Sequence, residues 1–135
     1  MIERIDHIGI AVRDLETALR TYTEGLGIAC THRETVADQK VNAAFLPVGE
    51  SNIELLESTS PDGPIGKFLE KRGEGIHHIC IAVSDIRKSL EQCRKAGMTL
   101  IDSEPRRGAH NKWVAFVHPK STHGVLLELS QDREE

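Results

Sequence analysis

Residues 4–14 read RIDHIGIAVRD, and residues 75–85 read GIHHICIAVSD. The two stretches match when the sequence is shifted by 71 positions, which places His7 on His78. The match keeps the order of the residues, so composition alone does not explain it. Each stretch is strand-like, because apolar residues dominate it over a short run. The chain therefore contains two copies of one unit.

Each copy of this strand leads into a predicted helix. Asp14 and Asp85 stand where N-cap residues are favoured. Glycines then mark the helix ends, at Gly25 and Gly27 in the first copy and at Gly97 in the second. The apolar residues between these signals follow helical spacing: Leu15, Ala18, Leu19 and Tyr22 in the first copy, and Ile86, Leu90 and Cys93 in the second.

Three further strands are predicted in each copy, so each is a βαβββ module. A Ser-, Pro- and Gly-rich connector separates the modules and runs into a short helix at residues 67–72. The predicted strands are 29–33, 41–46 and 53–57 in module one (1–60), and 100–103, 113–117 and 125–129 in module two (76–132), with the connector at 61–75. One module buries little core alone, so we expect a single α+β domain over residues 1–135, in which the paired modules form a cupped mixed sheet around a cleft.

Composition and charge narrow the class of protein. With 39% hydrophobic and 28% charged residues, the sequence is typical of a soluble globular protein. A net charge of −4 argues against nucleic-acid binding. No apolar run is long enough to span a membrane, and the three cysteines form no C-x-x-C pair. We expect a cytoplasmic protein with reduced thiols.

The histidines of the repeated strands share one face. Because side chains alternate along a strand, His7, Gly9 and Ala11 lie opposite the apolar residues that would pack under the helix. The second copy places His78 in the same way, with Cys80 and Ala82, whereas His77 points to the other side. A single histidine in such a strand is usually a hydrogen-bonded core residue. Two related ones, both beside small residues, favour paired ligands of one metal ion.

The last strand of each module carries a glutamate between apolar neighbours. Glu128 lies in VLLELS and Glu54 in NIELLE. A buried carboxylate needs a partner such as a metal ion, whereas on a half-exposed edge strand it would face water. A strict 71-residue shift matches Glu128 with Glu57, and a longer turn in module two matches it with Glu54. The residues alone leave both registers open.

These motifs together resemble the vicinal oxygen chelate (glyoxalase/bleomycin resistance/dioxygenase) superfamily and, within it, the methylmalonyl-CoA epimerases. DHIGIAVRDL carries the superfamily pattern, and AFLPVG, NIELLE, PIGKFLEKRGEGIHHICIAV and VAFVHPKSTHGVLLEL are similar to the epimerases. The resemblance implies one divalent ion per chain, in a metal-binding cleft, and it favours the register with Glu54. Its ligands would be His7, Glu54, His78 and Glu128.

The resemblance also implies the reaction, epimerisation of methylmalonyl-CoA at C2. Four protein ligands leave two octahedral positions at which an ion can chelate the substrate oxygens and stabilise enolate charge. A mixed N/O ligand set permits Co²⁺, which we favour, as well as Mn²⁺, Zn²⁺, Ni²⁺ or Fe²⁺. Some relatives carry an additional glutamate where Ala43 and Ala44 stand here. Glu54 and Glu128 are therefore the predicted acid–base residues, with a metal-bound water as the alternative for one of them.

An acyl-CoA substrate requires cations or polar groups outside the reacting centre. Predicted turns of module two contain four cations that can contact the CoA phosphates or remain solvated: Arg106, Arg107, Lys112 and Lys120. His110 can reach the substrate from the same loop. By resemblance we also expect a homodimer.

Three other functions fit parts of this pattern. A glyoxalase-like isomerase uses a similar ligand set on a glutathione adduct. A metal-free binding or resistance module needs none of the four ligands, and an iron dioxygenase needs two histidines and one carboxylate.

Overall fold

The observed elements repeat the two-module order of the sequence. The computed structural model describes residues 1–133, which divide into two compact units. Residues 7–77 form the N-terminal unit, and residues 1–6 with 78–133 form the C-terminal unit. Within residues 1–133, no helix has both the length and the apolar character needed to cross a membrane.

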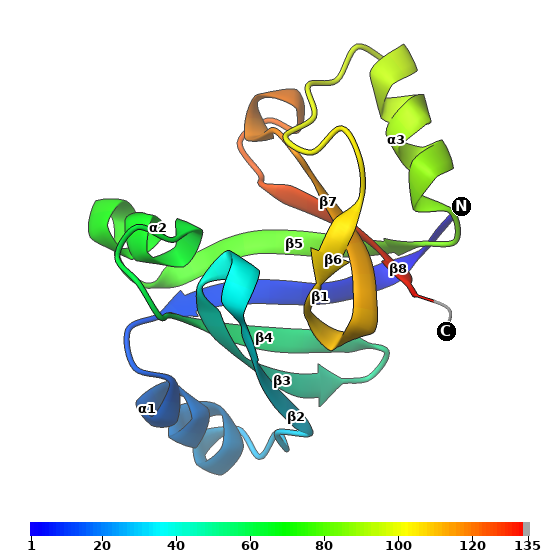
Figure 1. Cartoon of the computed structure of the whole chain (residues 1–135). Coiled ribbons are helices and arrows are strands. Elements are labelled where there is room, and N and C mark those ends of the chain that lie inside the picture. The colour runs from blue at the N-terminus through cyan, green and yellow to red at the C-terminus, as the bar shows by residue number, and fades with distance from the viewer. Residues whose placement is uncertain (134–135) are drawn as a thin grey trace. The chain divides into compact units, whose positions relative to one another are not determined.

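The N-terminal unit has the strand order β2-β3-β4-β1. β4 runs parallel to β1 and antiparallel to β3, which also pairs antiparallel with β2. Helix α1 lies beside β3 and β4 (Figure 1). The elements are β1 (Ile2–Val12), α1 (Leu15–Arg20) with a π-helical turn (Thr21–Gly25), β2 (His32–Val36), β3 (Val41–Val48), β4 (Ser51–Ser58) and α2 (Pro64–Arg72).

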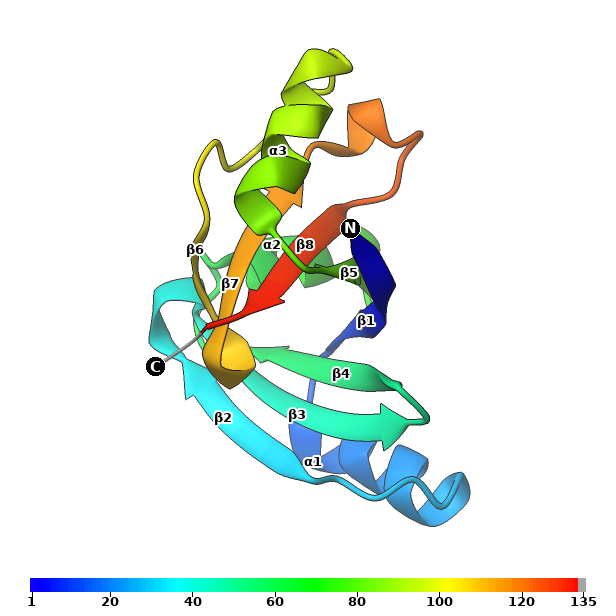
Figure 2. The same ribbon diagram turned by 90° about the vertical axis from the view of Figure 1, so that its right-hand side faces the viewer.

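The C-terminal unit repeats this arrangement in the order β5-β8-β7-β6. β8 runs parallel to β5 and antiparallel to β7, and α3 lies beside β7 and β8 (Figure 2). The elements are β5 (Gly75–Val83), α3 (Ile86–Lys95), β6 (Arg106–Gly108), β7 (Lys112–Val117) and β8 (Leu127–Asp132). The predicted α+β fold of two βαβββ modules is confirmed.

Each unit buries its helix against the predicted face of its first strand. In the N-terminal unit Val12 packs with Leu15 and Leu19, and Ile10 packs against this cluster. The C-terminal unit repeats the cluster with Val83, Ile86, Leu90 and Ile81. The alternation of side chains therefore leaves the histidine face of each strand on the side away from the helix.

Three strand predictions need correction. The strand predicted at 29–33 begins only at His32, and the one predicted at 125–129 runs from Leu127 to Asp132. Residues 100–103 form no strand: Leu100 makes an isolated bridge to Val117, and the edge strand is instead β6. The backbone and carboxylate of Asp102 both bind the backbone of Phe116, which replaces regular pairing there.

Both predicted N-caps are confirmed. The Asp14 carboxylate accepts from the Thr17 backbone N–H at 3.0 Å, and the Asp85 carboxylate accepts from the Lys88 N–H at 3.1 Å. The hydroxyl of Thr17 also donates to Asp14, and these hydrogen bonds lower the pKa of the Asp14 carboxyl. The ionised carboxylate is therefore the form that stabilises the helix start.

Replacing Asp14 with alanine should lower the free energy of unfolding at neutral pH, because the side-chain hydrogen bond to the start of α1 is lost. Because the folded pKa is the lower one, this stabilisation is present above the unfolded pKa and is lost as the pH falls through the folded value. Urea unfolding at pH 7 and below about pH 3 measures both effects. Asp38→Ala, at an exposed position in a turn, is the control. An equal loss at both pH values would contradict a charge-assisted cap.

Candidate functional site

A buried histidine and a buried glutamate meet in the N-terminal unit. The parallel pairing of β1 with β4 places Glu54 beside Gly9, two residues after His7. The imidazole Nε2 of His7 lies 3.4 Å from the Oε2 of Glu54. Both residues are less than 10% exposed.

The C-terminal unit contains the same pair. Here β5 and β8 run parallel, with Cys80 beside Glu128. The Nε2 of His78 lies 2.9 Å from the Oε1 of Glu128, and both side chains are buried. The ring of Phe116 stands edge-on to His78, with centroids 5.6 Å apart. Each unit therefore contains two of the four predicted ligands as one His–Glu pair.

Strand register identifies Glu54 as the counterpart of Glu128. Gly9 and Cys80 are equivalent positions of the repeat, and each is paired with one of these glutamates. Glu57 has another task, because its carboxylate accepts from the backbone N–H of Leu15 at 2.8 Å. In the other unit Gln131 accepts from Ile86 N–H at the same distance. Glu57 thus corresponds to Gln131 and supports the start of α1.

The donor atoms of each pair suit a metal ion. Neighbouring ligands of an octahedral ion at 2.0–2.1 Å lie roughly 3 Å apart. The His–Glu distances of 2.9 Å and 3.4 Å are close to that value. Imidazole nitrogen with carboxylate oxygen is also a donor set that first-row divalent ions accept. The residues present therefore fit a divalent ion.

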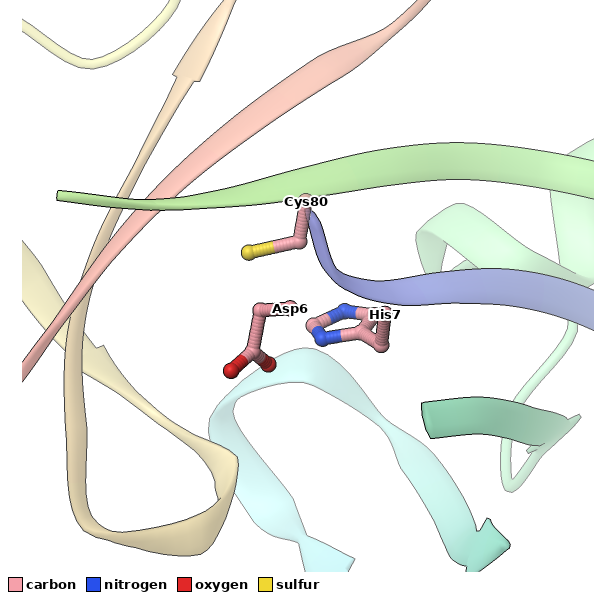
Figure 3. Close-up of side chains that lie close together, drawn as sticks. All are labelled: Asp6, His7 and Cys80. Carbon is pink, nitrogen blue, oxygen red and sulfur yellow. The ribbon is translucent and has the colours of Figure 1, made fainter. Parts of the chain in front are cut away.

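A buried carboxylate at Asp6 was missed in the sequence. Asp6 is 7% exposed, and one of its oxygens lies within 4.8 Å of the Cys80 thiol. Figure 3 draws both side chains, Asp6 from β1 and Cys80 from β5; His7, also labelled, is the next residue of β1 and belongs to the N-terminal unit. The guanidinium of Arg4 lies 3.5 Å from Asp6, and the Lys112 ammonium lies 3.7 Å from it. An acidic residue inside an apolar strand was the available signal, as it was for Glu54.

The three predicted substrate-binding residues lie in different surroundings of the C-terminal unit. His110 is exposed, in a turn between β6 and β7, and has a positive φ of 58°. Lys112 is the first residue of β7 and pairs with Asp132 at 2.5 Å as well as with Asp6. Lys120 is exposed in the turn after β7. Of the three, only Lys112 has a partly buried ammonium group that is held by carboxylates.

Known proteins resemble the chain over nearly its whole length. Residues 6–116 match the family described as the Glyoxalase/Bleomycin resistance protein/Dioxygenase superfamily. The uncharacterized protein YqjC of Bacillus subtilis is 42% identical over 98% of this chain and 94% of its own length. The ethylmalonyl-CoA/methylmalonyl-CoA epimerase of Cereibacter sphaeroides is 41% identical over 97% of this chain and 99% of its own. A solved methylmalonyl-CoA epimerase in complex with methylmalonyl-CoA and NH4+ is 38% identical, with a TM-score of 0.94 and coverage of 98% and 96%.

Replacing His7 or His78 with alanine should weaken retention of a divalent ion by more than about ten-fold. Mutating a residue that only supports a metal ligand already lowers metal affinity by at least about that factor, and these variants remove a proposed ligand itself. His77→Ala is the matched control, because the ring of His77 stands edge-on to Phe68 at 5.0 Å and alternation points it away from the His78 face. Each protein is dialysed first against Co²⁺ and then against metal-free buffer. Elemental analysis then measures how much Co²⁺ the protein retains. Equal loss in all three variants would show that the strand faces are assigned wrongly.

Proposed function

Because the chain belongs to the Glyoxalase/Bleomycin resistance protein/Dioxygenase superfamily, we propose that it interconverts (2R)- and (2S)-methylmalonyl-CoA. Relatives and solved structures that carry the name methylmalonyl-CoA epimerase align along nearly the whole chain, and an epimerase is an isomerase. The observation that carries the proposal is the repeated His–Glu pair, which supplies two imidazoles and two carboxylates. This donor set suits chemistry on a substrate with two neighbouring oxygens.

The two pairs are proposed to bind one divalent ion per chain. The ligands would be His7, Glu54, His78 and Glu128, with Co²⁺ preferred and Mn²⁺, Zn²⁺, Ni²⁺ or Fe²⁺ as alternatives. Zinc fits less well, because its usual tetrahedral coordination leaves no position for the substrate. When bound, such an ion would stabilise the negative charge that develops on the thioester and carboxylate oxygens.

Inversion at C2 requires proton transfer at both faces of a planar carbanion. A carboxylate on one face removes the proton, and a carboxylic acid on the other face returns one. We assign these tasks to Glu128 and Glu54, because they are the two carboxylates of the proposed ligand set. Burial of both side chains limits the access of water that would otherwise compete for the carbanion.

The substrate is proposed to be an acyl-CoA, with His110, Lys112 and Lys120 as candidate contacts for its polar groups. Lys120 is exposed, and within residues 1–133 its ammonium group forms no ion pair that a phosphate would have to displace. Lys112 would have to exchange Asp132 for the substrate, because its ammonium group already pairs with that carboxylate. We therefore expect Lys120 to contribute more to CoA binding. A cytoplasmic location remains a prediction from the sequence.

The wild-type protein with Co²⁺ should exchange the C2 hydrogen of methylmalonyl-CoA with D2O and produce both epimers. NMR of the C2 proton and separation of the epimers follow the two processes. The hemithioacetal of glutathione and methylglyoxal serves as the control substrate, and it should not be isomerised. Isomerisation of this adduct without exchange of methylmalonyl-CoA would instead favour the glyoxalase reaction.

Glu128→Gln should reduce epimerisation by about 10²–10⁴-fold, because an amide cannot accept the C2 proton. Its amide oxygen can still bind an ion, so the metal content should fall far less than the activity. Glu54→Gln should also keep the ion, since an amide oxygen can replace the carboxylate. Parallel loss of metal and activity in Glu128→Gln would restrict that residue to a ligand role.

The protein is also proposed to be a homodimer, because sheet edges and apolar side chains such as Ile2 and Ile76 remain exposed on the single chain. Sedimentation velocity at micromolar concentration should give about twice the 15.0 kDa chain mass. A monomer under these conditions would contradict the dimer without affecting the proposed chemistry.

A further inference from the structure

Strand register places another carboxylate on the face of the N-terminal unit that carries Glu54. Residues paired across neighbouring strands point to the same side of a sheet. Phe45 is paired with Glu54 in β4 and with His32 in β2. Two residues farther along β3, Ala43 is paired with Glu34 of β2. His32 and Glu34 therefore share the face of His7 and Glu54.

Contacts on the opposite face support this assignment. Arg33, which lies between His32 and Glu34, forms an ion pair with Glu16 of α1. Asn42, between Val41 and Ala43, donates to Glu57, the residue that holds the start of α1. The odd-numbered residues of β2 thus face the helix, and Glu34 faces away from it.

His32 and Glu34 form a hydrogen-bonded pair. The Nε2 of His32 lies 2.7 Å from the Oε1 of Glu34, and the imidazole packs against Phe45 with ring centroids 5.2 Å apart. The side chains are 38% and 30% exposed, so the pair is half-buried. A ring held by Phe45 fixes the orientation of the carboxylate. Beside this pair, the small side chain of Ala43 is buried and fills little space.

The proposed reaction asks two things of Glu54 that conflict. A carboxylate oxygen that binds an ion has less electron density to offer to a proton, and Glu128 meets the same conflict. A carboxylate outside the ligand set would relieve one of these two glutamates of proton transfer. Glu34 lies two strands away and two residues along the sheet, so its Cα is about 12 Å from that of Glu54. Two glutamate side chains directed over one face can contact a substrate between them at this separation.

We infer that Glu34 is a catalytic acid–base residue on the N-terminal side of the site, while Glu54 serves as a ligand. This inference rests on the proposed epimerase function. In one direction the C2–H bond breaks, its electron pair passes into the thioester enolate and its proton passes to Glu34. In the other direction Glu34 as a carboxylic acid returns a proton to C2 as the enolate collapses, and Glu128 acts on the opposite face. His32 positions the carboxylate through its hydrogen bond.

The test compares three glutamine variants in the full-length, Co²⁺-loaded protein. Glu34→Gln keeps an oxygen for His32 but cannot accept a proton. Glu16→Gln is the matched control, because it removes an ion-paired carboxylate from the helix side of the same strand. Glu54→Gln tests the competing assignment. Each epimer of methylmalonyl-CoA is supplied separately in D2O, and circular dichroism melting and metal content are measured for every variant.

Glu34→Gln should lower epimerisation at least about 100-fold. One epimer should still exchange its C2 hydrogen through Glu128, and the other should not. Glu16→Gln should match the wild type, and Glu54→Gln should retain more activity than Glu34→Gln. Wild-type rates in Glu34→Gln, or equal loss of exchange from both epimers, would overturn the inference. An inactive wild type would instead refute the proposed function, so the two failures are distinguishable.

Discussion

The central constraint on this protein is the burial of a carboxylate beside an imidazole in each unit. A buried ionised group is costly unless it is paired, and the Glu54–His7 and Glu128–His78 contacts provide that pairing. Parallel pairing of the first and last strand of a module is what brings each histidine and glutamate together. The βαβββ order produces this pairing, because the helix and two intervening strands allow the fourth strand to return beside the first.

The helices are tied to the same strands. Glu57 and Gln131, three residues after the site glutamates, accept from the first backbone N–H of α1 and α3. On a strand, a spacing of three points the two side chains to opposite faces. One strand therefore directs a carboxylate toward the site and a capping group toward the helix. Changes in the register of this strand would disturb both at once.

The two units share their backbone plan but differ in chemistry at the edge strand. Val114 of β7 corresponds to Ala43 of β3, since each lies two residues before the phenylalanine paired with a site glutamate. The residue paired with Val114 is Arg106, whereas the one paired with Ala43 is Glu34. Arg106 lies over the ring of Phe116, 5.6 Å from its centroid. An equivalent position thus carries a cation in one unit and a carboxylate in the other.

The sequence by itself determined the repeat, both helix caps and the faces of β1 and β5, and its resemblance to a known family predicted the set of four candidate site residues. These features depend on local spacing, on alternation along a strand or on matching motifs. All three can be recognised in a sequence without knowing which residues are in contact in the folded chain. Spacing alone did not decide which glutamate of module one is equivalent to Glu128, because the longer turn of module two shifts the register by three residues. The strand pairing in each unit decided it, with Glu54 beside Gly9 and Glu128 beside Cys80. Tertiary structure also decided the position of β6, where Asp102 binds the Phe116 backbone in place of a strand. The sequence also did not predict that Glu34 is paired with Ala43. Pairing between neighbouring strands is a non-local contact, and no short sequence pattern encodes it.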